Sequence, residues 1–140
     1  MNPRYFYVLL TLFILFFARV SVQLLQYYFN FEFFPSFENW HSDTLPYGLL
    51  LFFQLIIIFL CVSILIRVKN GFGLKNKYTI KVLFIFGIIY LFIMLFRLFL
   101  GMTFMSNHYW MDNPLPTIFH IVLAMFVLTY YHYLRTKLNE

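Results

Sequence analysis

The chain has 140 residues, of which 63% are hydrophobic and only 11% are charged. Soluble domains are about 45–50% apolar and about 25% charged, and a chain this short has too much surface for so few charges to cover in water. Composition therefore excludes a water-soluble fold and a disordered chain, and the single cysteine excludes an intramolecular disulfide. The sequence predicts an all-α polytopic integral membrane protein with a single membrane domain over residues 1–140.

Four apolar stretches are long enough to cross a hydrocarbon core of about 30 Å, which takes about 20 helical residues. In chain order they cover residues 5–29, 46–66, 79–103 and 116–134. Pro46 and Pro116 fit the first turn of a helix, where the missing N–H group has no helical partner to lose. Ser42, Asp43 or Thr44 can cap the second helix. The stretches predict a four-transmembrane-helix bundle.

The charges outside the apolar stretches are divided by sign. Two connections, after the first and third helices, carry acidic residues and no Lys or Arg: Glu32, Glu38, Asp43 and Asp112. The middle connection and the two terminal regions carry the basic residues Arg4, Arg67, Lys69, Lys75, Lys77, Lys81, Arg135 and Lys137. The positive-inside rule then places both termini in the cytoplasm, and we expect a multi-pass protein of the bacterial cytoplasmic membrane. The net charge of +5 reflects this topology, so no nucleic-acid partner is expected.

The two halves of the chain share a short pattern. When the chain is shifted by half its length, Trp40, Leu45 and Pro46 fall on Trp110, Leu115 and Pro116. Each half would then form one helical hairpin, and the two hairpins would follow in tandem. Interfacial Trp and first-turn Pro are expected in any such loop, so three matches also fit coincidence, which is the favoured explanation.

Strong polar groups inside the apolar stretches carry the functional information. An Arg within a membrane helix costs about 2.5–3.5 kcal/mol on insertion scales. Counting about 1.5 Å per residue places Arg19 and Arg97 in the outer third of the core, with Gln54 at the same height and His120 slightly above. All four helices therefore contribute to one predicted polar layer, which opens to the outside above an apolar floor.

Helical spacing supports this layer. Arg19, Gln23, Gln26 and Asn30 follow one face of the first helix, so we expect that face to point into the bundle. Tyr90, Arg97 and Gly101 share a face of the third helix, with Gly87 one turn before Tyr90. Glycines there would let a neighbouring backbone approach closely.

The predicted ligand is an amphiphile with an anionic head, such as a lipid phosphate, an isoprenoid phosphate or a fatty-acid carboxylate. The predicted ligand-binding residues are Arg19, Gln23, Gln54, Arg97 and His120. The planar guanidinium fork binds oxyanions at two points and stays charged, and the apolar floor suits a tail. A structural explanation also stands: the arginines could snorkel outward or pair with Glu38, Asp43 or Asp112.

Two further functions stay open. His120 could act as the acid or base of a membrane enzyme that acts on a lipid-like substrate, oriented by Asp43 or Asp112. Alternatively, His120 with His41 or His108 could hold a b-type haem whose propionates meet the arginines. No metal site is predicted, because no HExxH or acidic metal cluster is present.

The remaining predictions concern the surroundings of the protein. The lipid bilayer is the expected partner, and a larger membrane complex or a homo-oligomer is left open. His132, among Tyr130, Tyr131 and Tyr133, is interpreted as part of an anchor at the cytoplasmic headgroups.

Overall fold

The computed structural model describes residues 3–34, 46–103 and 114–140. Its helices are α1 (Pro3–Phe29), α3 (Tyr47–Lys69), α4 (Lys77–Thr103) and α5 (Pro114–Asn139). All four are long and apolar enough to cross a membrane, and the described residues contain no strand. The prediction of an all-α chain with four membrane-crossing helices is confirmed in these terms.

The helices run beyond the apolar stretches at several ends. α3 continues to Lys69 and α5 to Asn139, so basic residues lie in the last turn of each. Hydropathy falls at these charges, but the backbone hydrogen bonds continue through them. Positive side chains at a helix C-terminus also interact favourably with the helix dipole. Segments predicted from hydropathy are therefore too short where a helix ends in basic residues.

Pro46 lies just before the first residue of α3 and not within its first turn, where the sequence predicts it. It occupies the position before α3, with φ −54° and ψ 139°, and its carbonyl accepts a hydrogen bond from Leu50 N at 3.0 Å. Its extended backbone explains why the helix begins only at Tyr47. Ser42, Asp43 and Thr44, the predicted caps of this helix, lie outside the described residues.

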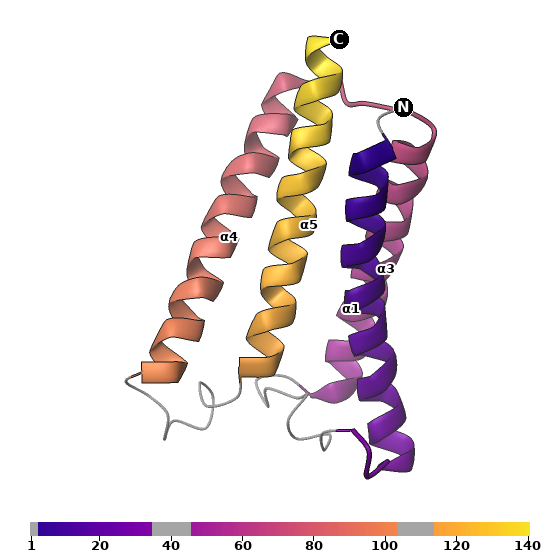
Figure 1. Cartoon of the computed structure of the whole chain (residues 1–140), viewed down its shortest axis with the longest axis vertical. Coiled ribbons are helices and arrows are strands. Elements are labelled where there is room, and N and C mark those ends of the chain that lie inside the picture. The colour runs from indigo at the N-terminus through magenta and orange to yellow at the C-terminus, as the bar shows by residue number, and fades with distance from the viewer. Residues whose placement is uncertain (1–2, 35–45, 104–113) are drawn as a thin grey trace.

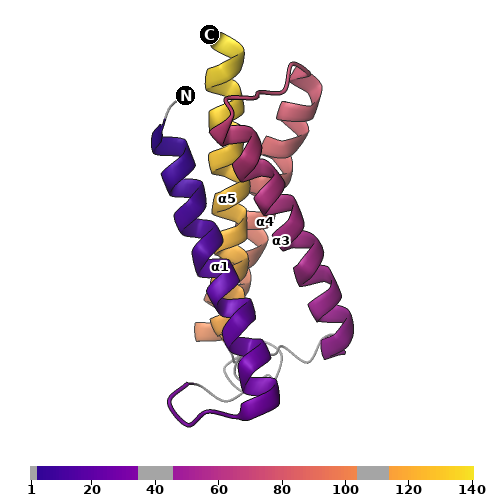
Figure 2. The same ribbon diagram turned by 90° about the vertical axis from the view of Figure 1, so that its right-hand side faces the viewer.

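The helices form an open row in which α4 packs along α5, α5 along α1, and α1 along α3 (Figures 1 and 2). Although α3 and α4 follow one another in the chain, they lie at opposite ends of this row. Both chain ends and the α3–α4 connection lie at one end of the molecule, the termini end, and we name the opposite end the far end.

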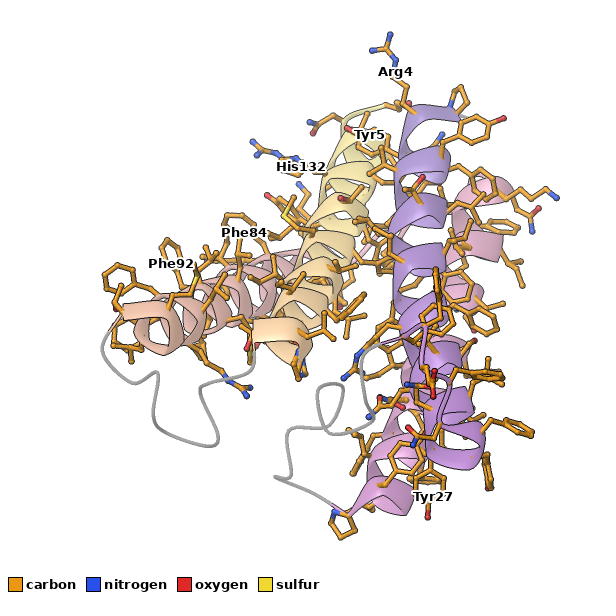
Figure 3. All side chains as sticks on the ribbon, turned by 60° about the horizontal axis from the view of Figure 1, so that its bottom comes forward. Arg4, Tyr5, Tyr27, Phe84, Phe92 and His132 are labelled. Atoms are coloured by element: carbon orange, nitrogen blue, oxygen red, sulfur yellow. The ribbon has the colours of Figure 1, made fainter. Side chains whose placement is uncertain are left out.

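The row leaves one side of the outermost helices uncovered. Lipid tails are as apolar as leucine side chains, so a membrane helix gains little hydrophobic energy by covering every face. α4 illustrates this, because Phe92 is 66% exposed and projects away from α5 (Figure 3). The outer faces of α3 and α4 therefore expose apolar side chains.

The largest apolar core lies toward the termini end and draws residues from all four helices. Its buried members are Leu9, Cys61, Leu65, Val68, Ile80, Phe126, Tyr130, Tyr133 and Leu134. Tyr133 is 1% exposed, and its hydroxyl donates to the Phe72 carbonyl at 3.1 Å. Its ring meets the Tyr5 ring edge-on with centroids 6.0 Å apart. Tyr133 therefore holds α1 and the α3–α4 connection against α5.

Two of the three tyrosines around His132 lie away from the surface, where an interfacial anchor is expected. Tyr130 and Tyr133 are buried in the core, because they share one face of α5 and stack with centroids 6.3 Å apart. Tyr131 is half-buried and packs on Phe84 at 4.6 Å. Only His132 is exposed as an anchor would be.

Gly87 sets the close approach of α4 to α5. A Cβ atom built there would lie 2.8 Å from Leu128 Cδ2, 3.1 Å from Leu128 Cγ and 3.2 Å from Val127 Cγ1. The sequence prediction that Gly87 admits a neighbouring helix is confirmed.

Gly87→Ala should lower the free energy of unfolding by about 1–3 kcal/mol, the usual cost of overpacking. Gly48→Ala is the matched control, because a Cβ there meets nothing within 4 Å and alanine favours helix. Unfolding in mixed micelles, followed by circular dichroism, measures both. If the two variants were equally stable, α5 would accommodate the added methyl group at position 87 without a loss of stability.

Candidate functional site

Polar side chains line the inner face of α1. Arg19, Gln23 and Gln26 are 7%, 0% and 2% exposed. Their spacing repeats every three or four residues, so they fall on one side of the helix, where α3 and α5 pack. The predicted polar stripe is confirmed up to Gln26.

Asn30 does not continue this stripe. It follows the last residue of α1, is exposed, and has a φ of +47° in the left-handed region that commonly ends helices. Gln26 instead stabilises the turn that follows. Its Oε1 accepts a hydrogen bond from Phe31 N at 2.6 Å, and its Nε2 donates to the carbonyls of Phe31 and Phe34 at 3.1 and 3.3 Å.

Gln23 and Gln54 join α1 to α3. Gln54 Nε2 donates to Gln23 Oε1 at 3.2 Å, and both side chains are buried. Gln54 Oε1 is also buried and has no hydrogen-bond partner among the described residues. A buried amide oxygen of this kind is a ready acceptor for a group that enters between these helices.

Tyr90 and His120 join α4 to α5. The Tyr90 hydroxyl and His120 Nδ1 share a short hydrogen bond, and the two rings meet edge-on with centroids 5.9 Å apart. Either atom can be the donor, depending on the histidine tautomer. Tyr90 is absent from the predicted ligand-binding residues. Its signal in the sequence is its position two turns before Arg97 on the same helical face.

The two arginines approach this pair from different helices. The Arg19 guanidinium carbon lies 5.6 Å from the centroid of the Phe119 ring, within cation–π range. Both Arg19 and Arg97 lie close enough to Tyr90 and His120 to interact with them electrostatically. Arg19 therefore lies beside the Tyr90–His120 pair, and Arg97 interacts with that pair electrostatically.

The order of the polar groups along the helices differs from the expected one. The sequence predicts His120 slightly above Arg97, but His120 pairs with Tyr90, two turns closer to the start of α4. Helical side chains lean toward the N-terminus of their helix, so the Arg97 side chain leans back toward Tyr90.

We name these residues the polar site: Arg19, Gln23, Gln54, Tyr90, Arg97 and His120. It consists of the Gln23–Gln54 pair, the Tyr90–His120 pair and the two arginines, of which Arg19 shares the buried face of α1 with Gln23. None of the four helices contains an Asp or Glu. Such a set offers many donors and positive charge to an oxyanion. Glu38, Asp43 and Asp112, the predicted pairing partners, lie outside the described residues.

The described residues do not fit a metal or a haem with two histidine ligands. They contain no group of three His, Cys, Asp or Glu side chains that could hold a metal ion. His120 and His132 are the histidines described, and their places on α5 are about 18 Å apart along the helix. The other predicted axial candidates, His41 and His108, lie outside the described residues.

The fold defines the class of protein, a helical chain with four helices able to span a membrane. Comparisons with protein families, curated proteins and solved structures gave no match. The chemistry of the polar site is therefore the basis for a function.

Proposed function

We propose that this is a small integral membrane binding or accessory protein whose polar site holds the anionic head of an amphiphile. The carrying observation is that Arg19 is buried against Phe119, the neighbour in sequence of His120, which is itself hydrogen-bonded to Tyr90 of α4. Arg97 of α4 also interacts electrostatically with this pair. Two cations in membrane helices each cost about 2.5–3.5 kcal/mol on insertion scales. An oxyanion bound between them would offset much of this cost.

The surroundings support an amphiphile over a small free anion. Toward the termini end, the side chains that follow the site are apolar: Phe16 and Leu9 on α1, and Ala124 and Phe126 on α5. These four are buried, so the floor of the site gives an ion no polar path. A tail placed along the neighbouring helices would stay in apolar surroundings, whereas its head would meet the guanidinium groups.

A second function, that of a membrane enzyme for a lipid-like substrate, is favoured by one observation. The hydrogen bond between Tyr90 and His120 fixes the orientation of the imidazole ring, and the tautomer sets whether its second nitrogen donates or accepts. An imidazole held in this way can transfer a proton, and the arginines can stabilise a developing oxyanion. Binding and catalysis would use the same residues, so variants have to separate them.

Dodecyl phosphate is a suitable probe of the binding function, with dodecyl maltoside as the neutral reference. We expect Arg97→Gln to weaken dodecyl phosphate binding at least about tenfold, because hydrogen bonds to charged groups contribute about 1.5–3 kcal/mol. Native mass spectrometry and the shift in Tm measure binding. Lys69→Gln is the control, since it removes the same charge at the termini end.

His120→Ala separates the two functions. A binding protein should lose ligand chiefly with Arg97→Gln, whereas an enzyme with His120 as acid or base should keep its ligand after His120→Ala and lose turnover. Equal dodecyl phosphate binding by the parent protein, Arg97→Gln and Lys69→Gln would contradict an anion site at Arg97.

The proposal includes an orientation, with both termini in the cytoplasm and the polar site toward the outside of a bacterial cytoplasmic membrane. The basic residues at the termini end support it by the positive-inside rule. In a Cys61→Ala background, Ser42→Cys should react with an impermeant thiol reagent in intact cells, and Asn76→Cys should not. The reverse pattern would show that the orientation is inverted.

The partners of the chain belong to the same proposal. The exposed apolar faces of α3 and α4 suit a lipid bilayer, and a homo-oligomer or a larger membrane complex could cover part of them. The tandem-hairpin repeat is also a proposal, for which the packing of α1 on α3 and of α4 on α5 is the support.

A further inference from the structure

The α3–α4 connection is fixed against α5 at the termini end. Gly71 takes a φ of +74°, which favours glycine, and Phe72 N donates to the Arg67 carbonyl at 2.9 Å. The Phe72 carbonyl in turn accepts the hydrogen bond from Tyr133. The residues that follow Phe72 therefore start from a defined position beside the last turns of α5.

A cavity of about 280 Å³ lies between this connection and α5, lined by Gly73, Leu74, Lys75, Lys137 and Leu138. Gly73 allows the α3–α4 connection to lie close to α5 at this cavity, because a Cβ atom at Gly73 would lie 3.2 Å from Lys137 Cβ. Lys75 and Lys137 come from different segments and line the same cavity. Two ammonium groups, two leucines and a glycine backbone make a lining that is cationic and partly apolar.

We propose that this cavity binds the headgroup phosphate of an anionic phospholipid such as phosphatidylglycerol. Lys137 is in the last turn of α5 and Lys75 precedes the start of α4, so the cavity lies where two membrane-crossing helices end. Phospholipid phosphates lie at this level of a bilayer, and lysines near the surface attract anionic lipids. Leu74 and Leu138 provide apolar contacts for the glycerol and upper acyl carbons.

Glu140 competes for one of these lysines. Lys137 Nζ donates to Glu140 Oε2 at 2.7 Å, and this hydrogen bond lowers the pKa of the Glu140 carboxyl, which is therefore ionised at neutral pH. The pair is exposed to solvent, and exposed pairs are weak. A lipid phosphate can therefore replace the carboxylate at Lys137.

The test uses the full chain in nanodiscs that contain phosphatidylcholine with or without phosphatidylglycerol. Native mass spectrometry then counts the lipids that stay bound. Lys75→Gln and Lys137→Gln should each lower the retained ratio of phosphatidylglycerol to phosphatidylcholine about fivefold, which corresponds to about 1 kcal/mol per lysine. Glu140→Gln should raise the ratio, because it removes the competing carboxylate.

Lys69→Gln is the matched control, since it removes a lysine from the same end but outside the cavity. An equal fall with Lys69→Gln would show general attraction to the basic end and overturn the site. Inorganic phosphate is also added to the protein in discs of phosphatidylcholine alone. If the protein binds this phosphate and loses it with both cavity variants, the cavity is a site for soluble phosphate and the lipid assignment is overturned. Both readouts are independent of Arg97→Gln, so this site and the polar site can fail separately.

Discussion

Tyr133→Ala should lower the free energy of unfolding by about 3–5 kcal/mol, the range for removal of a large buried aromatic side chain. The ring is 1% exposed and contacts Tyr5 and Tyr130, and its hydroxyl holds the α3–α4 connection through Phe72. Its loss would therefore loosen α1 and this connection together. Unfolding in mixed micelles, followed by circular dichroism, measures the change.

Two variants separate the causes of this effect. Tyr133→Phe keeps the ring and should cost only about 0.5–1.5 kcal/mol, the net value of one hydrogen bond. Tyr78→Ala removes a tyrosine from the same end that is 75% exposed, and should change stability little. If Tyr133→Ala lost no more stability than Tyr78→Ala, the termini-end core would not hold the helices together.

The membrane-crossing helices could be predicted because hydropathy depends only on local composition. Their ends could not be placed as well. Arg67 and Lys69 lower the local hydropathy and yet continue α3, since a charged side chain can reach water from a helix that is still hydrogen-bonded. Basic helix ends therefore extend beyond an apolar stretch.

The order of the helices could not be predicted from the sequence. α3 and α4 are apolar around most of their circumference, and Gln54 on α3 and Arg97 on α4 do not identify which neighbour each helix contacts. Gly87 was the local signal of a close approach, but a glycine does not identify the helix that fills its space. The open row therefore depends on packing between side chains distant in sequence.

Part of the candidate site could be predicted from the sequence, namely the strongly polar residues that lie within the apolar stretches. The sequence indicates Arg19, Gln54 and His120, because polar groups in an apolar stretch must face something other than lipid. Tyr90 and Tyr133 were missed as contacts, because tyrosine is amphipathic and equally suited to a membrane interface. Only the structure shows that their hydroxyls bond to His120 and to the Phe72 carbonyl.

The double variant Arg19→Gln/Arg97→Gln should reduce dodecyl phosphate binding to the background level. Each guanidinium would contribute about 1.5–3 kcal/mol to a bound phosphate, so removing both should weaken binding by about a hundredfold or more. The single variants should each keep part of the affinity, because the remaining arginine and His120 stay in place. Titration followed by the shift in Tm gives the three affinities.

The stability of the same variant without ligand tests whether the arginines serve binding or the fold. If they serve binding, the protein carries their insertion cost of about 2.5–3.5 kcal/mol each until a ligand offsets it. The ligand-free double variant should then be as stable as the parent protein or more stable, although its response to dodecyl phosphate is lost. If they serve the fold, removing both should lower the free energy of unfolding and leave the ligand response unchanged. The opposite signs of these two outcomes make the measurement decisive, because a protein that loses only stability has structural arginines and no amphiphile site.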